Sequence, residues 1–231
     1  MSLFKIPFLL STIWGMHTTL TPPHPPPPSN EIVAPDGLKI LAPLLKLGFW
    51  AAGLAEVAVI LASRYPQIWT SQLVLRMLVH RPIDPKATLE MTYPFVLGWF
   101  FSLSGGIIRR QCYLTLGRYF TFELSIRKDH HLVTSGPYSI VRHPSYTGAA
   151  FAAIGGALSH LNHASWAVAC SGLIPDSPIA FASLWLFAAI VAGSVIIPRL
   201  PKEDDMMRRE FGEEWVRWAR NVPFRLIPGV Y

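Results

Sequence analysis

One polar run, residues 130–148, brings basic and tyrosine side chains together just ahead of an apolar segment. His143 precedes a proline and is therefore disfavoured in helical backbone, so the next helix is expected to begin directly after it. Arg142, His143, Ser145 and Tyr146 would then gather at a helix N-terminus, whose free N–H groups suit an anion such as a carboxylate. From physics alone, an interfacial helix cap anchored by Arg142 and Tyr146 is an equally good interpretation.

A second charged run lies nearer the C-terminus. It reads Arg199-Leu200-Pro201-Lys202-Glu203-Asp204-Asp205. Proline is favoured at the first helical position and acidic residues in the first turn, so this run predicts a helix from about 201 to 220. Within that helix an apolar stripe is formed by Met207, Phe211, Trp215 and Trp218. Taken alone, the charged run is explained by helix capping and solvated charge.

The composition indicates a protein that lies in a lipid bilayer. Of the 231 residues, 51% are hydrophobic and 15% are charged, whereas soluble domains carry roughly 25% charged residues. The net charge of +6 comes from basic residues that flank apolar runs, which is typical of membrane helix ends. Nucleic acid is therefore not expected as a partner. The two cysteines form no C-x-x-C motif and are expected to be inert thiols.

About five apolar segments predict an all-α integral membrane protein, folded as a multi-span helical bundle. They are residues 3–20, 40–62, 92–108, 145–172 and 178–198. The first segment could instead be the core of a signal peptide, but no good cleavage site follows it, and a membrane helix is the preferred interpretation. Glu56 lies within the second segment and is expected to face other helices, because a carboxylate facing lipid is costly. Residues 63–91 are predicted to form an interfacial amphipathic helix and a loop.

The last two apolar segments are predicted to form a helical hairpin, residues 145–198. Gly148, Ala152 and Gly156 recur every four residues, and small residues on one face let membrane helices approach closely. Because a hairpin returns the chain to the side it left, the polar residues 109–144 and 199–231 are expected to meet over its mouth. The chain is thus divided into N-terminal membrane helices, 1–108, with a proline-rich linker at 21–29, and a functional region, 109–231.

Two long motifs carry a family resemblance. The run from His130 to Gly148 fits the pattern H-x-L-V-T-S-G-x-Y, four residues, then R-H-P-S-Y-x-G, without a gap. The second pattern, an arginine, three residues, an acidic pair and then F-G-E-E-Y, is met by Arg199, Glu203-Asp204 and the run from Phe211 to Trp215. Asp204 and Trp215 stand where the pattern has Glu and Tyr. Residues 112–231 therefore resemble the isoprenylcysteine carboxyl methyltransferase family.

The resemblance implies transfer of a methyl group from S-adenosylmethionine to the C-terminal α-carboxylate of a prenylated protein or a small prenylcysteine. It also implies a C-terminal, cytosol-facing cofactor pocket in the endoplasmic reticulum membrane. No metal is expected, because the sequence shows no credible metal cluster. The cofactor contacts it implies are His130, His131, Leu132, Val133, Tyr138, His143, Pro144, Ser145, Tyr146 and Glu203, with Glu123 as a further contact. Arg199 is implied to bind the substrate and, together with Glu203, to be catalytic.

Three other functions stay open at this point. A phospholipid N-methyltransferase would use Arg199 for a phosphate and would need a base to deprotonate the amine. A non-catalytic membrane paralogue would keep the fold and lose turnover. A metal site built from His130, His131 and His143 is disfavoured, because adjacent histidines rarely share one metal face. A soluble nucleotide-binding methyltransferase is excluded, since no G-x-G-x-x-G follows a predicted strand.

Overall fold

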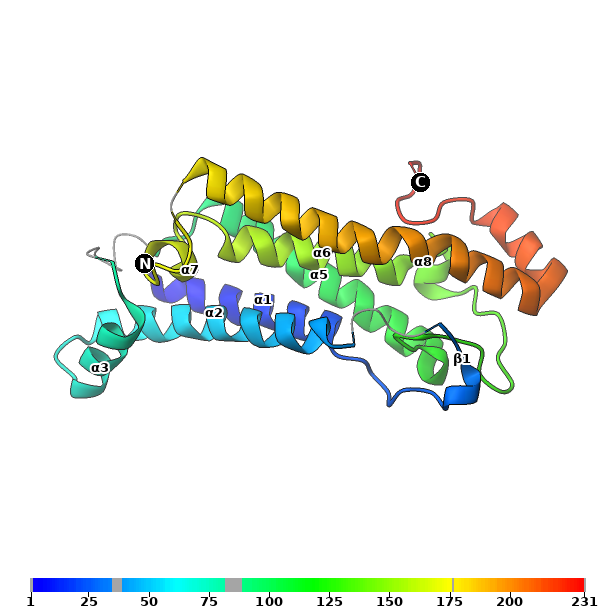
Figure 1. The fold of residues 1–231 in the computed structure, drawn as a ribbon, viewed down its shortest axis with the longest axis horizontal. Helices are drawn as coiled ribbons and strands as arrows, with labels where there is room; N and C mark the ends of the chain where they lie inside the picture. The colour runs from blue at the N-terminus through cyan, green and yellow to red at the C-terminus, as the bar shows by residue number, and fades with distance from the viewer. Residues whose placement is uncertain (1, 35–38, 82–88, 176, 231) are drawn as a thin grey trace.

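The computed structural model describes residues 2–34, 39–81, 89–175 and 177–230. The described chain is mostly helical, and its long helices run side by side in a bundle (Figure 1). The long helices are α1 (Lys5–Leu20), α2 (Leu41–Arg64), α5 (Tyr93–Leu116), α6 (Pro144–His160) and α8 (Pro178–Asn221). The short helices are α3 (Trp69–Leu78), α7 (Trp166–Ala169) and the 3-10 turns η1 (Ser2–Phe4), η2 (Ser29–Glu31), η3 (Gly117–Tyr119) and η4 (Gly136–Ser139).

A small antiparallel ladder joins the linker after α1 to the loop after α5. It pairs β1 (Ile32–Ala34) with β2 (Leu124–Ser125), with Ile32 opposite Ser125. The all-α prediction is correct for the bundle and missed this ladder. Since β2 belongs to the loop that follows α5, the ladder helps to hold that loop against the end of the bundle.

The closest helix packing is between α5 and α6. A Cβ atom added to Gly105 of α5 would lie 2.5 Å from the backbone nitrogen of Ala152 and the carbonyl oxygen of Gly148 on α6. The small-residue face of α6 was predicted to pack against residues 178–198, and this is wrong. Close approach needs small side chains on both helices. Gly105 of α5 meets Gly148 and Ala152 of α6, whereas Gly156 of α6 faces Phe49 of α2 and Met16 of α1.

The N-terminal helix lies within the bundle, where α1 contacts α2, α5 and α6. Lys5 on α1 and Glu56 on α2 are fully buried and form an ion pair, with Nζ 2.7 Å from Oε1. Lys5 also donates to the Ala164 carbonyl at 2.9 Å, and the second Glu56 oxygen accepts from the Trp166 backbone N–H at 2.9 Å. Glu56 thus faces other helices, as predicted, and residues 5–20 form a helix of the bundle.

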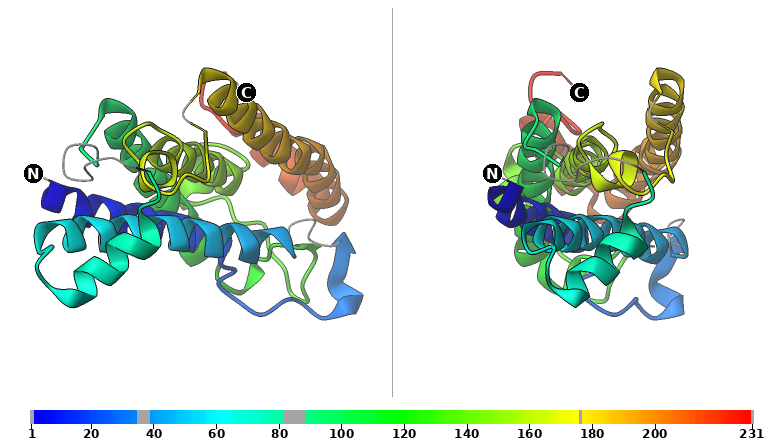
Figure 2. Two further views of the ribbon diagram at one scale, coloured as in Figure 1. Left: turned by 60° about the vertical axis from the view of Figure 1, so that its left-hand side comes forward. Right: turned by 90° about the vertical axis from the view of Figure 1, so that its left-hand side faces the viewer.

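Two helices of the described chain, α2 and α8, are long and apolar enough to cross a membrane. None of the apolar window of α8 is buried against the rest of the protein, and Figure 2 shows this helix standing beside the bundle. Its exposed side chains include Leu186, Phe187 and Ile190. An apolar surface of this extent needs lipid or a partner to cover it. The full count of about five spans stays a prediction.

Two predicted segment ends were wrong. The segment 92–108 continues as α5 to Leu116, so Arg109 lies inside the helix and the division of the chain at 108 falls within it. The segment 145–172 stops being helical after His160. There the Asn162 amide donates to the carbonyl groups of Leu158 and Ser159 at 2.8 and 2.9 Å, which satisfies carbonyls that a helix end leaves free.

The predicted helix 201–220 is not separate, because α8 runs from Pro178 to Asn221 with Pro198 and Pro201 inside it. Pro201 was expected at a first helical position, and this is wrong. Gly212 interrupts the helix with a φ of 51°, a backbone conformation that glycine adopts readily. Arg199 and Glu203 therefore lie one turn apart on a continuous helix and point to the same side.

Candidate active site

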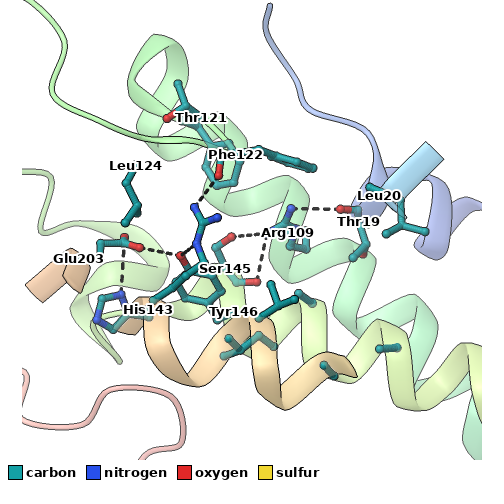
Figure 3. Close-up of a pocket in the computed structure, with 18 of the residues that line it drawn as sticks. Thr19, Leu20, Arg109, Thr121, Phe122, Leu124, His143, Ser145, Tyr146 and Glu203 are labelled. Carbon is teal, nitrogen blue, oxygen red and sulfur yellow. Dashed lines mark hydrogen bonds and ion pairs between the residues drawn. The ribbon is translucent and has the colours of Figure 1, made fainter. Parts of the chain in front are cut away.

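A cavity of about 440 Å³ lies between α1, α2, α5, α6 and α8. Its charged end is at the N-terminus of α6 (Figure 3), and the rest is an apolar groove along α6 and α8. The groove is lined on α6 by Ala149, Ala153, Ala157 and His160 and on α8 by residues that include Leu184, Ala188 and Val191. The cavity therefore joins a polar chamber to an apolar channel.

Tyr146 links the two charged residues of α8 in the polar chamber. Its hydroxyl accepts a hydrogen bond from Arg199 Nε at 3.1 Å and donates one to Glu203 Oε2 at 2.8 Å. Arg199 Nη2 also donates to the Phe122 carbonyl at 2.5 Å. These bonds hold the guanidinium and the carboxylate in the cavity wall in defined positions. They also bring the two polar stretches of the sequence together, as the hairpin argument predicts.

His143 is buried at the N-cap of α6 between two carboxylates. Its Nε2 lies 2.9 Å from Asp204 Oδ1 and its Nδ1 lies 3.6 Å from Glu203 Oε1. Burial lowers the pKa of His143, but hydrogen bonds to Asp204 and Glu203 and their negative charge outweigh it and raise the pKa to about 9. His143 is therefore an imidazolium at neutral pH, and it fixes the Glu203 carboxylate from the side opposite Tyr146.

Asp204 forms ion pairs through both of its carboxylate oxygens. Its second oxygen lies 3.2 Å from Arg142 Nη1 and 3.1 Å from Arg225 Nε, while the first faces His143. The C-terminal chain is tied to the same turn, because the backbone N–H of His143 donates to the Arg225 carbonyl at 2.8 Å. Asp204 is thus a positioning residue that joins α8, the turn before α6 and the C-terminal segment.

The His143 ion pairs predict a pH-dependent stability. A histidine whose pKa is about 6.5 in the unfolded chain and about 9 in the folded chain stabilises the fold most below pH 6.5. That stability, about 3 kcal/mol, is lost as the pH rises from about 6.5 through 9. Thermal unfolding of the detergent-purified protein should show this loss. We expect His143→Gln to flatten the profile and the exposed His163→Gln to keep it; a flat wild-type profile would contradict the pairing.

The loop between α5 and α6 forms another wall of the chamber. The half-buried His130 ring stacks on Tyr119 with centroids 4.6 Å apart and meets the edge of Phe211 at 5.5 Å. Burial, together with the charges of His131 and Arg127, lowers the pKa of His130. The Tyr138 carbonyl accepts from Trp218 Nε1 at 3.2 Å. His130 is therefore a neutral, aromatic part of the wall at neutral pH.

Most of the residues that the sequence singled out line this cavity. They are Glu123, His130, Leu132, Val133, Tyr138, His143, Ser145, Tyr146, Arg199 and Glu203. Two others lie outside its wall: His131 is exposed on the loop, and Pro144 is buried in the first turn of α6. The functional roles given to all of these residues stay predictions.

Sequence reasoning missed several polar residues of the wall, and Arg109 and His160 are the two that are basic. Arg109 was interpreted as the polar flank of an apolar segment that ends at residue 108. Its position directly after that segment was the one sign in the sequence that it could belong to the same helix. His160 lies in the middle of a predicted apolar segment and carries no motif. It closes the far end of the groove, and neither of its ring nitrogens has a partner among the described residues.

The chamber suits a polar small molecule, and the described residues show no metal site. No group of three or more His, Cys, Asp or Glu side chains in the described part of the chain is arranged to hold a metal ion. Buried polar atoms without a hydrogen-bond partner among the described residues include His130 Nδ1 and Arg109 Nε. Such atoms are costly to bury, and a ligand with polar groups would satisfy them.

Comparison with known proteins points to one family. Residues 97–207 match the isoprenylcysteine carboxyl methyltransferase (ICMT) family, which confirms the resemblance drawn from the two motifs. Protein-S-isoprenylcysteine O-methyltransferase B of Arabidopsis thaliana is 35% identical over 122 residues, 52% of each chain. Protein-S-isoprenylcysteine O-methyltransferase A of the same plant is 32% identical over 128 residues, 54% of this chain and 55% of that protein.

A second kind of relative matches less of its own length. A Delta(14)-sterol reductase of Methylotuvimicrobium alcaliphilum is 30% identical over 101 residues, which is 43% of this chain and 19% of the reductase. The chain spans about half the length of the curated methyltransferases it matches. The residues that match the family model, 97–207, include all of α6 and the part of α8 that carries Arg199 and Glu203.

Proposed function

We propose, on the premise that residues 97–207 match the isoprenylcysteine carboxyl methyltransferase family, that this protein is a membrane enzyme. It would transfer a methyl group from S-adenosylmethionine to the C-terminal α-carboxylate of a prenylated cysteine and form a methyl ester. The acceptor would be a prenylated protein or a small prenylcysteine. From the same resemblance we place it in the endoplasmic reticulum membrane with the active site facing the cytosol.

The observation that carries the proposal is the two-part cavity. Arg199, Tyr146 and Glu203 stand at its charged end, and an apolar groove leads away from them along α6 and α8. A prenylcysteine has the same two parts, an anionic carboxylate and a long apolar chain. The α6 wall from Tyr146 to His160 is about 21 Å long at 1.5 Å per residue, so an extended chain fits along it.

The exposed apolar face of α8 gives such a chain a route from the lipid. Side chains of this helix, including Phe187 and Val191, line the groove, and the apolar window of the helix is not covered by the rest of the protein. A prenyl chain dissolved in the bilayer therefore reaches the groove without crossing water. This explains why an enzyme whose reacting group is a polar carboxylate would be embedded in a membrane.

The chemistry makes few demands on the protein. A terminal carboxyl has a pKa near 3.5 and is already ionised at neutral pH, so no general base is needed. The protein must hold the nucleophile, align it and exclude water. Arg199 suits the carboxylate because a guanidinium offers a planar pair of donors. Tyr146 keeps that guanidinium oriented through its 3.1 Å contact.

The remaining chamber residues would hold the cofactor. S-adenosylmethionine supplies a methyl group on a positively charged sulfur. We assign its binding to His130, Leu132, Val133, Tyr138, Ser145, Tyr146 and Glu203, all of which line the cavity, with Glu123 as a further contact. His143 supports them by holding Glu203, whose negative charge suits a cationic ligand.

A methylation assay in membranes that contain the protein tests the proposal. With labelled S-adenosylmethionine we expect N-acetyl-farnesylcysteine to be methylated and phosphatidylethanolamine not. The product is expected to be an ester, so alkali should release its label as methanol, whereas an N-methyl amine would keep it. Activity should survive a chelator. Methylation of the phospholipid alone would establish the N-methyltransferase function instead, and cofactor binding without turnover on either acceptor would establish a non-catalytic paralogue.

A further inference from the structure

Arg109 places a buried cation in the wall of the chamber. It lies on α5, seven residues before the helix ends at Leu116, and is 6% exposed. Its Nη1 donates to Ser145 Oγ at 2.5 Å and its Nη2 to the Thr19 carbonyl at 3.1 Å (Figure 3). A guanidinium cannot lose its proton in a protein. The wall of the chamber therefore carries a positive charge at this point.

No carboxylate of the described residues compensates this charge. None of the ion pairs among the described residues includes Arg109. Arg109 packs instead against the rings of Tyr113, Phe120 and Phe122, whose centroids lie 5.2, 5.4 and 5.1 Å from its Cζ. Its Nε is buried without an acceptor there. Ring faces and neutral carbonyls compensate a buried charge less completely than an anion does.

A role for Arg109 in the fold alone would be to cap the C-terminal end of α1. Thr19 lies in the last turn of α1, and a cation is favoured beside the carbonyl end of a helix. That role explains the contact to Thr19. It does not explain why the side chain lines the ligand cavity or why it also reaches Ser145, in the first turn of α6, where free N–H groups favour an anion.

We propose that Arg109 is a second carboxylate-binding residue of the chamber, beside Arg199. Both arginines contact Phe122: Arg199 donates to its carbonyl, and Arg109 packs on its ring. The inference rests on the proposed function, in which both ligands, S-adenosylmethionine and the prenylcysteine, carry an α-carboxylate. A charge-assisted hydrogen bond from a guanidinium is a strong way to hold a carboxylate, and Arg109 supplies a guanidinium that the family motifs do not include.

Binding measurements with and without the carboxylate test this inference. Calorimetric titration of the purified protein would compare S-adenosylhomocysteine with its decarboxylated analogue, and N-acetyl-farnesylcysteine with N-acetyl-farnesylcysteamine. We expect Arg109→Gln to weaken one of the two carboxylate-bearing ligands by at least about tenfold, since hydrogen bonds to charged groups are the stronger ones. The matching carboxylate-free analogue should lose no more than about twofold. The ligand affected shows which carboxylate Arg109 holds.

A residue that only supports the fold gives a different pattern. Equal losses with and without the carboxylate, for both pairs of ligands, would overturn the inference and leave the proposed function intact. Wild-type protein that binds none of the four ligands would contradict the proposed function and the inference together. Arg109→Lys keeps the positive charge but loses the planar pair of donors. It replaces the glutamine variant in these titrations if Arg109→Gln does not fold. The exposed neighbour Arg110→Gln removes the same charge and should leave all four affinities unchanged.

Discussion

Arg199→Lys is expected to lower carboxylate methylation about 100-fold while leaving cofactor affinity nearly unchanged. Lysine keeps the positive charge but loses the planar pair of donors that matches a carboxylate. It also loses the bonds to Tyr146 and the Phe122 carbonyl, at 3.1 and 2.5 Å, that position the guanidinium. Removing one positioned donor at a site where charge changes during reaction costs about 100- to 1,000-fold in turnover. Initial rates against acceptor concentration, together with a cofactor titration, measure both effects.

Glu203→Gln is the complementary half of this prediction. The amide can still accept from Tyr146 but loses the negative charge beside His143, so cofactor affinity should fall by about tenfold or more and the acceptor KM should change little. Two exposed positions on α8 supply the controls, Arg208→Lys and Asp205→Asn. Normal turnover in both site variants would show that the two residues only join helices. Loss of phospholipid methylation alone in Arg199→Lys would favour the N-methyltransferase function.

Gly105→Ala is expected to cost about 3 kcal/mol or more of stability and to separate α5 from α6. The added methyl group would lie 2.5 Å from backbone atoms of Ala152 and Gly148, which cannot move aside as a flexible side chain would. Overpacking of this kind costs about 1–3 kcal/mol even where side chains can adjust. Because α5 and α6 carry Arg109, Ser145 and the other chamber residues, cofactor binding should be lost together with the fold. Thermal unfolding in detergent measures the change.

A second glycine makes this result specific to packing. Alanine is favoured over glycine inside a helix by about 1 kcal/mol, so a helical Gly→Ala change is stabilising where space allows. Gly48 on α2 has nothing within 4 Å of an added Cβ, and Gly48→Ala should therefore be neutral or stabilising. If Gly105→Ala proved as stable as Gly48→Ala, the tight α5–α6 contact would be refuted.

Local patterns in the sequence were enough to predict several features of this protein. Helix α2 and the start of α6 at Pro144 follow from an apolar run and from a His-Pro pair, because these signals act over a few residues. The two motifs carried the family resemblance, and the hairpin argument brought Tyr146 and Glu203 to the same end of the bundle. Glu56 was expected to be buried among helices because its carboxylate could not face lipid.

Other features depend on groups far apart in the chain, and only the tertiary structure decided them. Gly148 and Ala152 of α6 pack on α5, because Gly105 lets the two backbones approach closely there. The burial of Arg109 depends on α1 and on three rings from α5 and the loop after it. The ion pairs of Asp204 reach Arg225 near the C-terminus. None of these contacts leaves a periodic signal in its own segment, since hydrophobic periodicity and capping residues report only on neighbours along one helix.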